Sequence, residues 1–270
     1  MKKKPLFYVA LALCLALALF SGYKVVTISA EYRAGDAAAA ELQQFIVLDP
    51  TQPESPATCP PTQAPEYSDE TAPTEIPEPT EDPYPYPEVD FESLQGINPD
   101  VVGWILIEGT NINYPIVRGA DNSRYLSVMA DGRRNAAGSI FMDYRCASDF
   151  SDSHTVIYGH NMRNGSMFHN IRLYSRPEFL AEHPMGIILT PEKNFRFEVI
   201  GGYVAKPDSE AWRLDFNSGE EFAGWLDASM AASEFDSGIV PTAEDRIITL
   251  STCSYEFNNA RYVLICRVIC

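Results

Sequence analysis

Three residues that lie far apart in the chain have side chains that could together carry out acyl transfer: His160, Cys253 and Arg261. A cysteine is a strong nucleophile only as thiolate, and a nearby imidazole can take up its proton and later protonate a departing amine. A guanidinium stays charged and can donate hydrogen bonds to an oxyanion that develops on the attacked carbonyl. Because this chemistry uses neither metal nor cofactor, we expect none.

The surrounding sequence predicts that all three residues lie at strand ends. Cys253 follows the predicted strand 246–252, and Arg261 opens the last strand of the chain. If these two strands are antiparallel neighbours, a short loop brings Cys253 and Arg261 to the same end of the sheet. His160 follows another predicted strand, 154–158, so a rigid scaffold could aim the three side chains at one place.

The domain that must supply this scaffold is predicted to be mainly β. Eight short runs rich in β-branched and aromatic residues are separated by Gly, Asn, Asp and Pro, which is typical of a barrel or sandwich. We expect a β-barrel with peripheral helices. The predicted strands are 101–107, 111–117, 139–142, 154–158, 186–190, 195–206, 246–252 and 261–269. The predicted helices are 90–98, 167–183 and 218–235, the last with Ser218 as its N-cap.

The N-terminus carries a membrane signal. Lys2, Lys3 and Lys4 precede a mostly apolar stretch that ends near Ile28, and a span needs about 20 residues. We interpret residues 1–30 as a single uncleaved transmembrane helix, although the small residues at 29 and 30 leave a cleaved signal peptide open. The positive-inside rule then leaves the rest of the chain outside the cell.

Residues 31–88 form the second predicted unit. The segment 31–47 reads as a helix that leaves the membrane. Twelve prolines follow between Pro50 and Pro87, and such a composition cannot bury enough apolar surface to fold. We interpret this stretch as a disordered, extended tether that holds the third unit, a folded domain at 89–270, away from the membrane.

The charge of the chain is concentrated in this second unit and its flanks. The net charge is −17, and 16 of the 37 acidic residues lie in 34–117, a stretch without Lys or Arg. Subtracting 16 from 37 leaves 21 acidic against 20 basic residues, so the rest of the chain is nearly neutral. Nucleic-acid partners are disfavoured because their phosphates need basic patches.

The segments around the trio resemble the sortase family of cysteine transpeptidases. Residues 249–253 read Thr-Leu-Ser-Thr-Cys and match the TLxTC signature of sortases, with Arg261 at the right distance in the next strand. The segment Tyr158-Gly159-His160-Asn161 matches the one that holds the family's catalytic histidine. The resemblance starts near Asp90 and looks closest to class B, as judged from 102–105, 112–117, 139–145, 158–168 and the extra helix 218–235.

The resemblance implies a sortase-type eight-stranded β-barrel, anchored in the bacterial cell membrane with its catalytic domain extracellular. It implies that Cys253 attacks the Thr carbonyl in a C-terminal sorting motif of a secreted protein. His160 would protonate the leaving amine, and Arg261 would hold the substrate and stabilise the oxyanion. An amine of peptidoglycan, of its lipid-linked precursor or of a pilin would then resolve the thioacyl enzyme.

By position within the resemblance, four further residues are expected to line the substrate groove: Asn122, Leu126, Tyr158 and Ser251. The alternatives are a turn residue for Asn122 and core packing for Leu126. Cys266 and Cys270 have no role that the family suggests. A disulfide between them would be strained, since residues four apart on a strand lie roughly 13 Å apart.

Two other functions remain open from the sequence. A cysteine peptidase would use the same three residues with water as the acceptor. A catalytically silent binding module on a stalk would contain Cys253 only as a packing residue. A metalloprotein is disfavoured because the sequence has no CxxC or His-x₃-His spacing.

Overall fold

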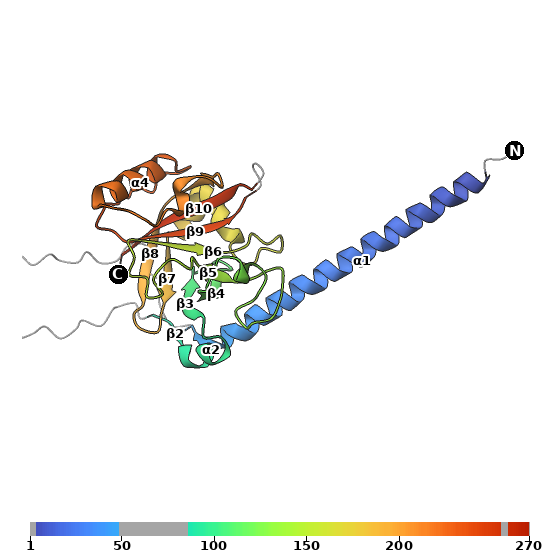
Figure 1. The fold of residues 1–270 in the computed structure, drawn as a ribbon, viewed down its shortest axis with the longest axis horizontal. Coiled ribbons are helices and arrows are strands. Elements are labelled where there is room, and N and C mark those ends of the chain that lie inside the picture. Colours follow the sequence, from blue (N-terminus) through green and yellow to red (C-terminus); the bar gives the residue numbers. More distant parts are fainter. Residues whose placement is uncertain (1–3, 49–85, 255–258, 270) are drawn as a thin grey trace, which may run out of the picture.

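The computed structural model describes residues 4–48, 86–254 and 259–269, and a closed eight-stranded β-barrel forms its centre (Figure 1). The strand order around the barrel is β10-β8-β7-β3-β4-β5-β6-β9. The predicted mainly β fold is therefore confirmed. The strands are β3 (Val101–Leu106), β4 (Asn113–Val117), β5 (Ile140–Met142), β6 (His154–Tyr158), β7 (Met185–Leu189), β8 (Phe195–Ala205), β9 (Ile247–Cys253) and β10 (Arg261–Val268).

Two of the eight strand pairings are parallel, namely β4 with β5 and β6 with β9. The other six are antiparallel, including β9 with β10 as the sequence predicts. A parallel pair needs a long crossover connection, and the one from β6 to β9 contains β7, β8 and the helical segments between residues 169 and 231. The chain thus returns to place β9 directly beside β6.

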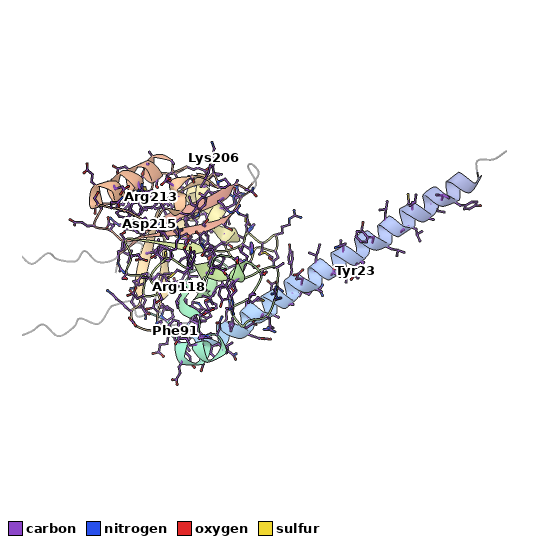
Figure 2. The ribbon with its side chains drawn as sticks, in the orientation of Figure 1. Tyr23, Phe91, Arg118, Lys206, Arg213 and Asp215 are labelled. Atoms are coloured by element: carbon purple, nitrogen blue, oxygen red, sulfur yellow. The ribbon has the colours of Figure 1, made fainter. Side chains whose placement is uncertain are left out.

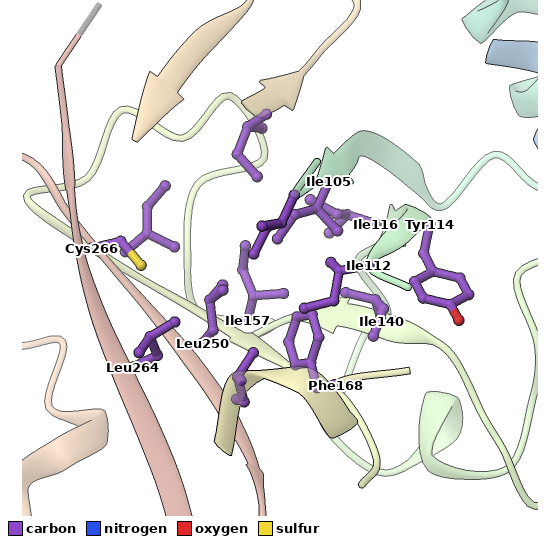
Figure 3. Close-up of a cluster of buried hydrophobic side chains, with 14 of the residues drawn as sticks. Ile105, Ile112, Tyr114, Ile116, Ile140, Ile157, Phe168, Leu250, Leu264 and Cys266 are labelled. Atoms are coloured by element: carbon purple, nitrogen blue, oxygen red, sulfur yellow. The ribbon is translucent and has the colours of Figure 1, made fainter. Parts of the chain in front are cut away.

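The barrel interior is filled by alternate residues of the strands. Ile157 of β6, Leu250 of β9 and Leu264 of β10 meet there with other fully buried aliphatic and aromatic side chains (Figure 3). Cys266 belongs to the same cluster, is a free thiol and has its pKa raised by burial, so it packs as an apolar residue. Cys270 lies outside the described residues.

Two of the predicted helices form with their caps. Helix α2 (Phe91–Ile97) starts at Asp90, whose carboxylate accepts from the Ser93 amide at 3.0 Å. Helix α4 (Gly219–Ala231) starts at Ser218, whose hydroxyl accepts from the Glu221 amide at 3.2 Å. The apolar side of α4 packs on the outer face of the barrel, in a cluster of Phe222, Trp225 and Leu226 with Ile200, Ile247 and Ile265.

The predicted single helix at 167–183 is wrong. The structure has a 3₁₀ helix, η3 (His169–Ser175), followed by a separate short helix, α3 (Pro177–Glu182). Arg176 between them is extended, with φ −99° and ψ 121°. The residue before a proline is pushed out of the α region, and proline itself suits the first turn of a new helix. Pro177 therefore divides the segment in two.

The N-terminal helices are also joined differently from the expectation. One continuous helix, α1 (Lys4–Leu42), includes both the expected span and most of the helix expected at 31–47. The last turn tightens into the 3₁₀ helix η1 (Gln43–Phe45), and the chain then enters strand β1 (Ile46–Val47). Strand β1 pairs with β2 (Glu88–Val89) in a two-stranded ribbon that the sequence analysis does not predict.

The first half of α1 stands clear of the barrel (Figure 1). It is the one helix in the described part of the chain that is long and apolar enough to cross a membrane. Large apolar and aromatic side chains in this half, such as Tyr23, point outward without a protein partner surface around them (Figure 2). Such a surface suits a lipid environment.

The ribbon of β1 and β2 brings together the two points at which the chain enters and leaves the expected tether. Residues 49–85 lie outside the described residues, but the strands that flank the proline-rich segment are paired, Ile46 with Val89 and Val47 with Glu88. Helix α1 also reaches the domain before this segment begins, and Ala38 and Leu42 are buried there. The length of the proline-rich segment therefore does not set the distance between the apolar helix and the barrel.

The filled barrel yields a stability prediction. Leu264→Ala removes a fully buried side chain from the core and should lower the free energy of unfolding by about 2–5 kcal/mol. Val240→Ala, at a side chain that is 83% exposed, should change it by less than about 0.5 kcal/mol. Chemical unfolding of the full chain in detergent checks both, and equal losses would contradict the assignment of Leu264 to the core.

Candidate active site

The ends of β6 and β9 bring a histidine and a cysteine to the same corner of the barrel. These strands are parallel and in register, with Tyr158 opposite Ser251. His160 and Cys253 each follow two residues later, so they leave the pair at the same level. Since side chains alternate between the two faces of a strand, residues two apart share a face. Register alone thus predicts that the imidazole and the thiol are neighbours.

Gly159 allows the chain beyond β6 to stay close to the barrel. A Cβ at this position would lie 2.5 Å from Ile140 and 2.7 Å from the Phe168 ring, so no larger residue fits without displacement. The backbone here is pinned to β9, because the Gly159 amide donates to the Ser251 carbonyl at 3.0 Å. The Thr252 hydroxyl donates to the Gly159 carbonyl at 2.7 Å. The backbone just before His160 is therefore fixed by close packing against Ile140 and Phe168 and by two hydrogen bonds to β9.

Strand β10 supplies the third side chain. Arg261 is the register partner of Cys253 in the antiparallel β9–β10 pair. Side chains of directly opposite residues lie on the same face with Cβ atoms about 5 Å apart. That face is the outer one, because Leu250 and Leu264 of the same two strands, at the alternate positions, point into the core. Cys253 is partly buried and lies on the outside of the barrel at its rim.

His160 is held in one tautomer by the backbone. Its Nε2 lies 2.9 Å from the carbonyl oxygen of Leu126, which ends the 3₁₀ helix η2 (Arg124–Leu126). A carbonyl only accepts, so Nε2 carries a proton and Nδ1 is the nitrogen left for the thiol. Hydrogen bonding to Cys253 is the largest cause that raises the pKa of His160, with partial burial acting against it.

The thiol is activated by its two neighbours. The hydrogen bond with His160 is the largest cause that lowers the pKa of Cys253, and the charge of Arg261 lowers it further against the effect of burial. A lowered thiol pKa and a raised imidazole pKa both favour the pair of thiolate and imidazolium. This pair has a nucleophile and an acid in contact, which is what acyl transfer from an amide requires.

Arg261 is positioned by main-chain carbonyls. Its Nη1 donates to the carbonyls of Asn259 and Ala260, each at 3.1 Å. Among the described residues these bonds engage only Nη1, so Nε and Nη2 can donate to a substrate oxygen. The guanidinium can therefore stabilise negative charge next to Cys253 without leaving its backbone support.

Asn161, which has no predicted role in the sequence analysis, binds the backbone of the nucleophile. Its amide nitrogen donates to the Cys253 carbonyl at 3.0 Å, and its oxygen lies 2.8 Å from Nδ1 of His169. Asn161 also forms a bridge with Met167, which closes the loop after His160. The residue stands next to His160 in the recognised segment, but its type alone gave no signal of this contact.

A second unpredicted residue, Asp143, organises two of the predicted substrate-binding residues. Its carboxylate is fully buried and accepts from Asn122 Nδ2 and from the Tyr158 hydroxyl, both at 2.9 Å. Arg145 adds a bidentate ion pair with both donors at 2.9 Å. Burial would raise the pKa of Asp143, but these hydrogen bonds hold it below its ordinary value. The carboxylate thus stays charged and fixes the side chains around it.

The other two predicted substrate-binding residues differ in exposure. Ser251 is buried, and its hydroxyl accepts from the Trp212 indole at 3.0 Å. Trp212 ends the 3₁₀ helix η4 (Glu210–Trp212). Leu126 is 45% exposed and so is not core packing, while its carbonyl holds His160. Leu126 thus contacts His160 directly, and Tyr158 and Ser251 lie two residues before His160 and Cys253 in their strands. Asn122 is connected to Tyr158 through the Asp143 carboxylate.

Comparisons with known proteins agree with this geometry. The sequence profile of the sortase domain matches residues 105–269. Sortase B of Listeria monocytogenes is 38% identical over 167 residues, which cover 62% of this chain and 68% of that protein. The substrate complex of Staphylococcus aureus sortase B superposes with a TM-score of 0.63 at 32% identity, covering 66% of this chain and 84% of that one.

A third relative covers more of the chain. The crystal structure of Bacillus anthracis sortase B in complex with AAEK1 has a TM-score of 0.69 at 28% identity, over 90% of this chain and 99% of that chain. The matched profile, residues 105–269, includes β6, β9 and β10, which carry the site. The chain therefore belongs to the sortase family, with class B sortases as its relatives, and is a cysteine transpeptidase.

Proposed function

We propose that this transpeptidase cleaves a C-terminal sorting motif of secreted proteins after Thr and transfers the acyl group to a cell-wall or pilin amine. The observation that carries the proposal is the contact of His160 with Cys253, with Arg261 opposite the thiol in the register of β9 and β10. The similarity to a substrate complex of S. aureus sortase B supports a substrate site in this fold.

The proposed reaction begins with the thiolate of Cys253. Its sulfur bonds to the carbonyl carbon of Thr, and the π electrons of the carbonyl move onto the oxygen, where Arg261 donates hydrogen bonds. Collapse of this intermediate breaks the C–N bond, and the imidazolium of His160 gives its Nδ1 proton to the leaving amine. A thioacyl enzyme and neutral His160 remain.

The second half reverses these proton movements. An acceptor amine attacks the thioacyl carbon while Nδ1 of His160 takes one of its protons. The C–S bond breaks, an amide forms, and the thiolate of Cys253 returns beside an imidazolium. The hydrogen bond from Nε2 to Leu126 keeps the ring orientation through both halves, so the same nitrogen serves as acid and as base.

The substrate contacts proposed for the four remaining residues differ in kind. Leu126 has an exposed side chain next to His160 and is proposed to contact the sorting motif directly. Asn122, Tyr158 and Ser251 direct their polar groups to Asp143 or Trp212, so they are proposed to shape the surface on which the motif lies. Their assignment as substrate-binding residues stays a prediction.

The proposed location is the cell membrane, with α1 as a single-pass anchor and the barrel outside the cell. Its support is the apolar first half of α1 and the three lysines that precede this apolar stretch, which favour a cytoplasmic N-terminus. The proposed macromolecular partners are secreted proteins that carry the motif, and peptidoglycan or its lipid-linked precursor as the amine acceptor.

The nucleophile is tested by Cys253→Ala in the full chain. We expect loss of peptide cleavage and of the thioacyl adduct, detected by mass spectrometry after incubation with a Thr-containing peptide library, with unfolding unchanged. Cys14→Ala, which removes a thiol from the apolar half of α1, is the control and should keep both. With the unmodified protein, an added amine should give a ligated product, whereas hydrolysis alone would identify a peptidase. Peptide cleavage by the Cys253→Ala variant would refute the role of Cys253 as nucleophile.

The oxyanion role is tested at Arg261. Arg261→Ala should lower kcat by about 10²–10³ fold, the range measured when an oxyanion donor is lost. Arg261→Lys keeps the charge but not the planar fork, so it should recover only part of that loss. Steady-state kinetics on the cleaved peptide would measure this, and a change confined to KM would point to substrate binding alone.

The lowered pKa of Cys253 predicts reactivity at a lower pH than for an ordinary thiol. A thiolate that is stabilised by His160 forms earlier as the pH rises, so iodoacetamide should label Cys253 with a midpoint below the ordinary value of about 8.5. His160→Gln should move the midpoint upward. Peptide-resolved mass spectrometry across pH measures both, and a midpoint that His160→Gln leaves in place would contradict the hydrogen bond as its cause.

A further inference from the structure

The second half of α1 is packed against the catalytic domain. Its buried face consists of residues at helical spacing: Tyr32, Gly35, Ala38, Ala39 and Leu42. At Gly35 the helix approaches so closely that an added Cβ would lie 3.1 Å from the Asn135 side chain. The residues between these, such as Ala37, face solvent. We call this packed stretch, 31–42, the docked segment.

The docked segment holds the loop that orients His160. The Asn135 amide nitrogen donates to the Glu31 carbonyl at 3.0 Å, and the carboxylate of Glu31 accepts from the Ala136 amide at 3.1 Å. The backbone of Asn135 donates in turn to the Ser127 carbonyl at 3.1 Å. Ser127 directly follows Leu126, whose carbonyl accepts from His160. The loop 127–136 thus connects α1 to the hydrogen bond between Leu126 and His160.

The docked segment also holds the loop that follows His160. The Asn164 side chain donates to both oxygens of Asp36, at 2.9 and 3.1 Å. This loop closes on itself through the Phe168 amide, which donates to the His160 carbonyl at 2.9 Å. It also contains Asn161, whose side-chain nitrogen donates to the Cys253 carbonyl. A second, separate path of contacts therefore leads from α1 to the same imidazole and to the nucleophile.

We propose that helix α1 is a positioning element for the reaction, because its docked segment braces both loops that hold His160 beside Cys253. The proposal rests on the proposed function, in which His160 is the acid and base. It predicts that the anchor of this enzyme contributes to turnover itself and is not only an attachment to the membrane. Undocking of α1 should loosen the imidazole while leaving the barrel intact.

The first test compares two identical changes on neighbouring positions of α1 in the full chain, in detergent or nanodiscs. Ala38→Glu places a carboxylate on the buried face, while Ala37→Glu places it in solvent. With a soluble peptide substrate, Ala38→Glu should lower kcat about fivefold or more with a smaller change in KM. It should also raise the pH midpoint of Cys253 alkylation. Equal kcat and equal midpoints for the two variants would overturn the proposal.

The second test uses a surface pair, so that folding is not at risk. Asn164→Asp sets two carboxylates against each other but keeps the oxygen that caps Ser166. It should lower kcat and raise the alkylation midpoint. Adding Asp36→Asn restores an amide-to-carboxylate hydrogen bond and should reverse both effects. A loss that Asp36→Asn does not reverse would overturn the brace through Asp36.

The two proposals fail in different ways. If the unmodified chain forms no thioacyl adduct on Cys253, the proposed function fails before any variant is compared. If the adduct forms and all variants have the same kcat, the proposal that α1 positions His160 fails while the proposed function stands. Thermal unfolding of each variant serves as the control for global stability.

Discussion

The in-register parallel pairing of β6 with β9 is the constraint on which the rest of the site depends. Because Tyr158 lies opposite Ser251, the residues two positions later, His160 and Cys253, leave the sheet together on one face. The antiparallel register of β10 then sets Arg261 beside the thiol. A slip of one residue in either pairing would turn a side chain to the other face. The core on the inner face resists such a slip, since it would expose Leu250 and Leu264.

The same outer face of the barrel carries two histidines whose pKa values are shifted in opposite directions. His154 at the start of β6 is buried against Trp225 and lies between the Arg213 carbonyl and the Thr249 hydroxyl. Burial lowers its pKa to about 4, which keeps it neutral, whereas the thiol contact raises the pKa of His160. At His154 burial outweighs the charge of Asp143 and favours a structural, neutral imidazole. At His160 the hydrogen bond with Cys253 outweighs burial and favours an imidazole that can exchange protons.

The sequence was sufficient for the barrel and for the approach of the trio, because strand periodicity and a short connection between the last two strands are local signals. Pro177 is also a local signal, which predicts a break after Arg176 in the segment 167–183. The contacts of Asn161 and Asp143 were out of reach, since each depends on which distant backbone or side chain lies opposite. The ribbon of β1 and β2 has only two residues in each strand, too few for any periodicity.

The connection between anchor and barrel shows how topology can override composition. A proline-rich acidic segment between an apolar helix and a folded domain predicts a spacer, and composition alone carries no contrary information. Yet α1 continues for about four turns beyond the apolar stretch, from Ile28 to Leu42, and docks. With a rise of about 1.5 Å per residue, Asp36 lies roughly 12 Å along the helix from Ile28. The residues of α1 that bind the two loops around His160, Glu31 and Asp36, therefore lie within about that axial distance of the apolar stretch. The proline-rich segment leaves from β1 and returns at β2, so its length can vary without moving the site.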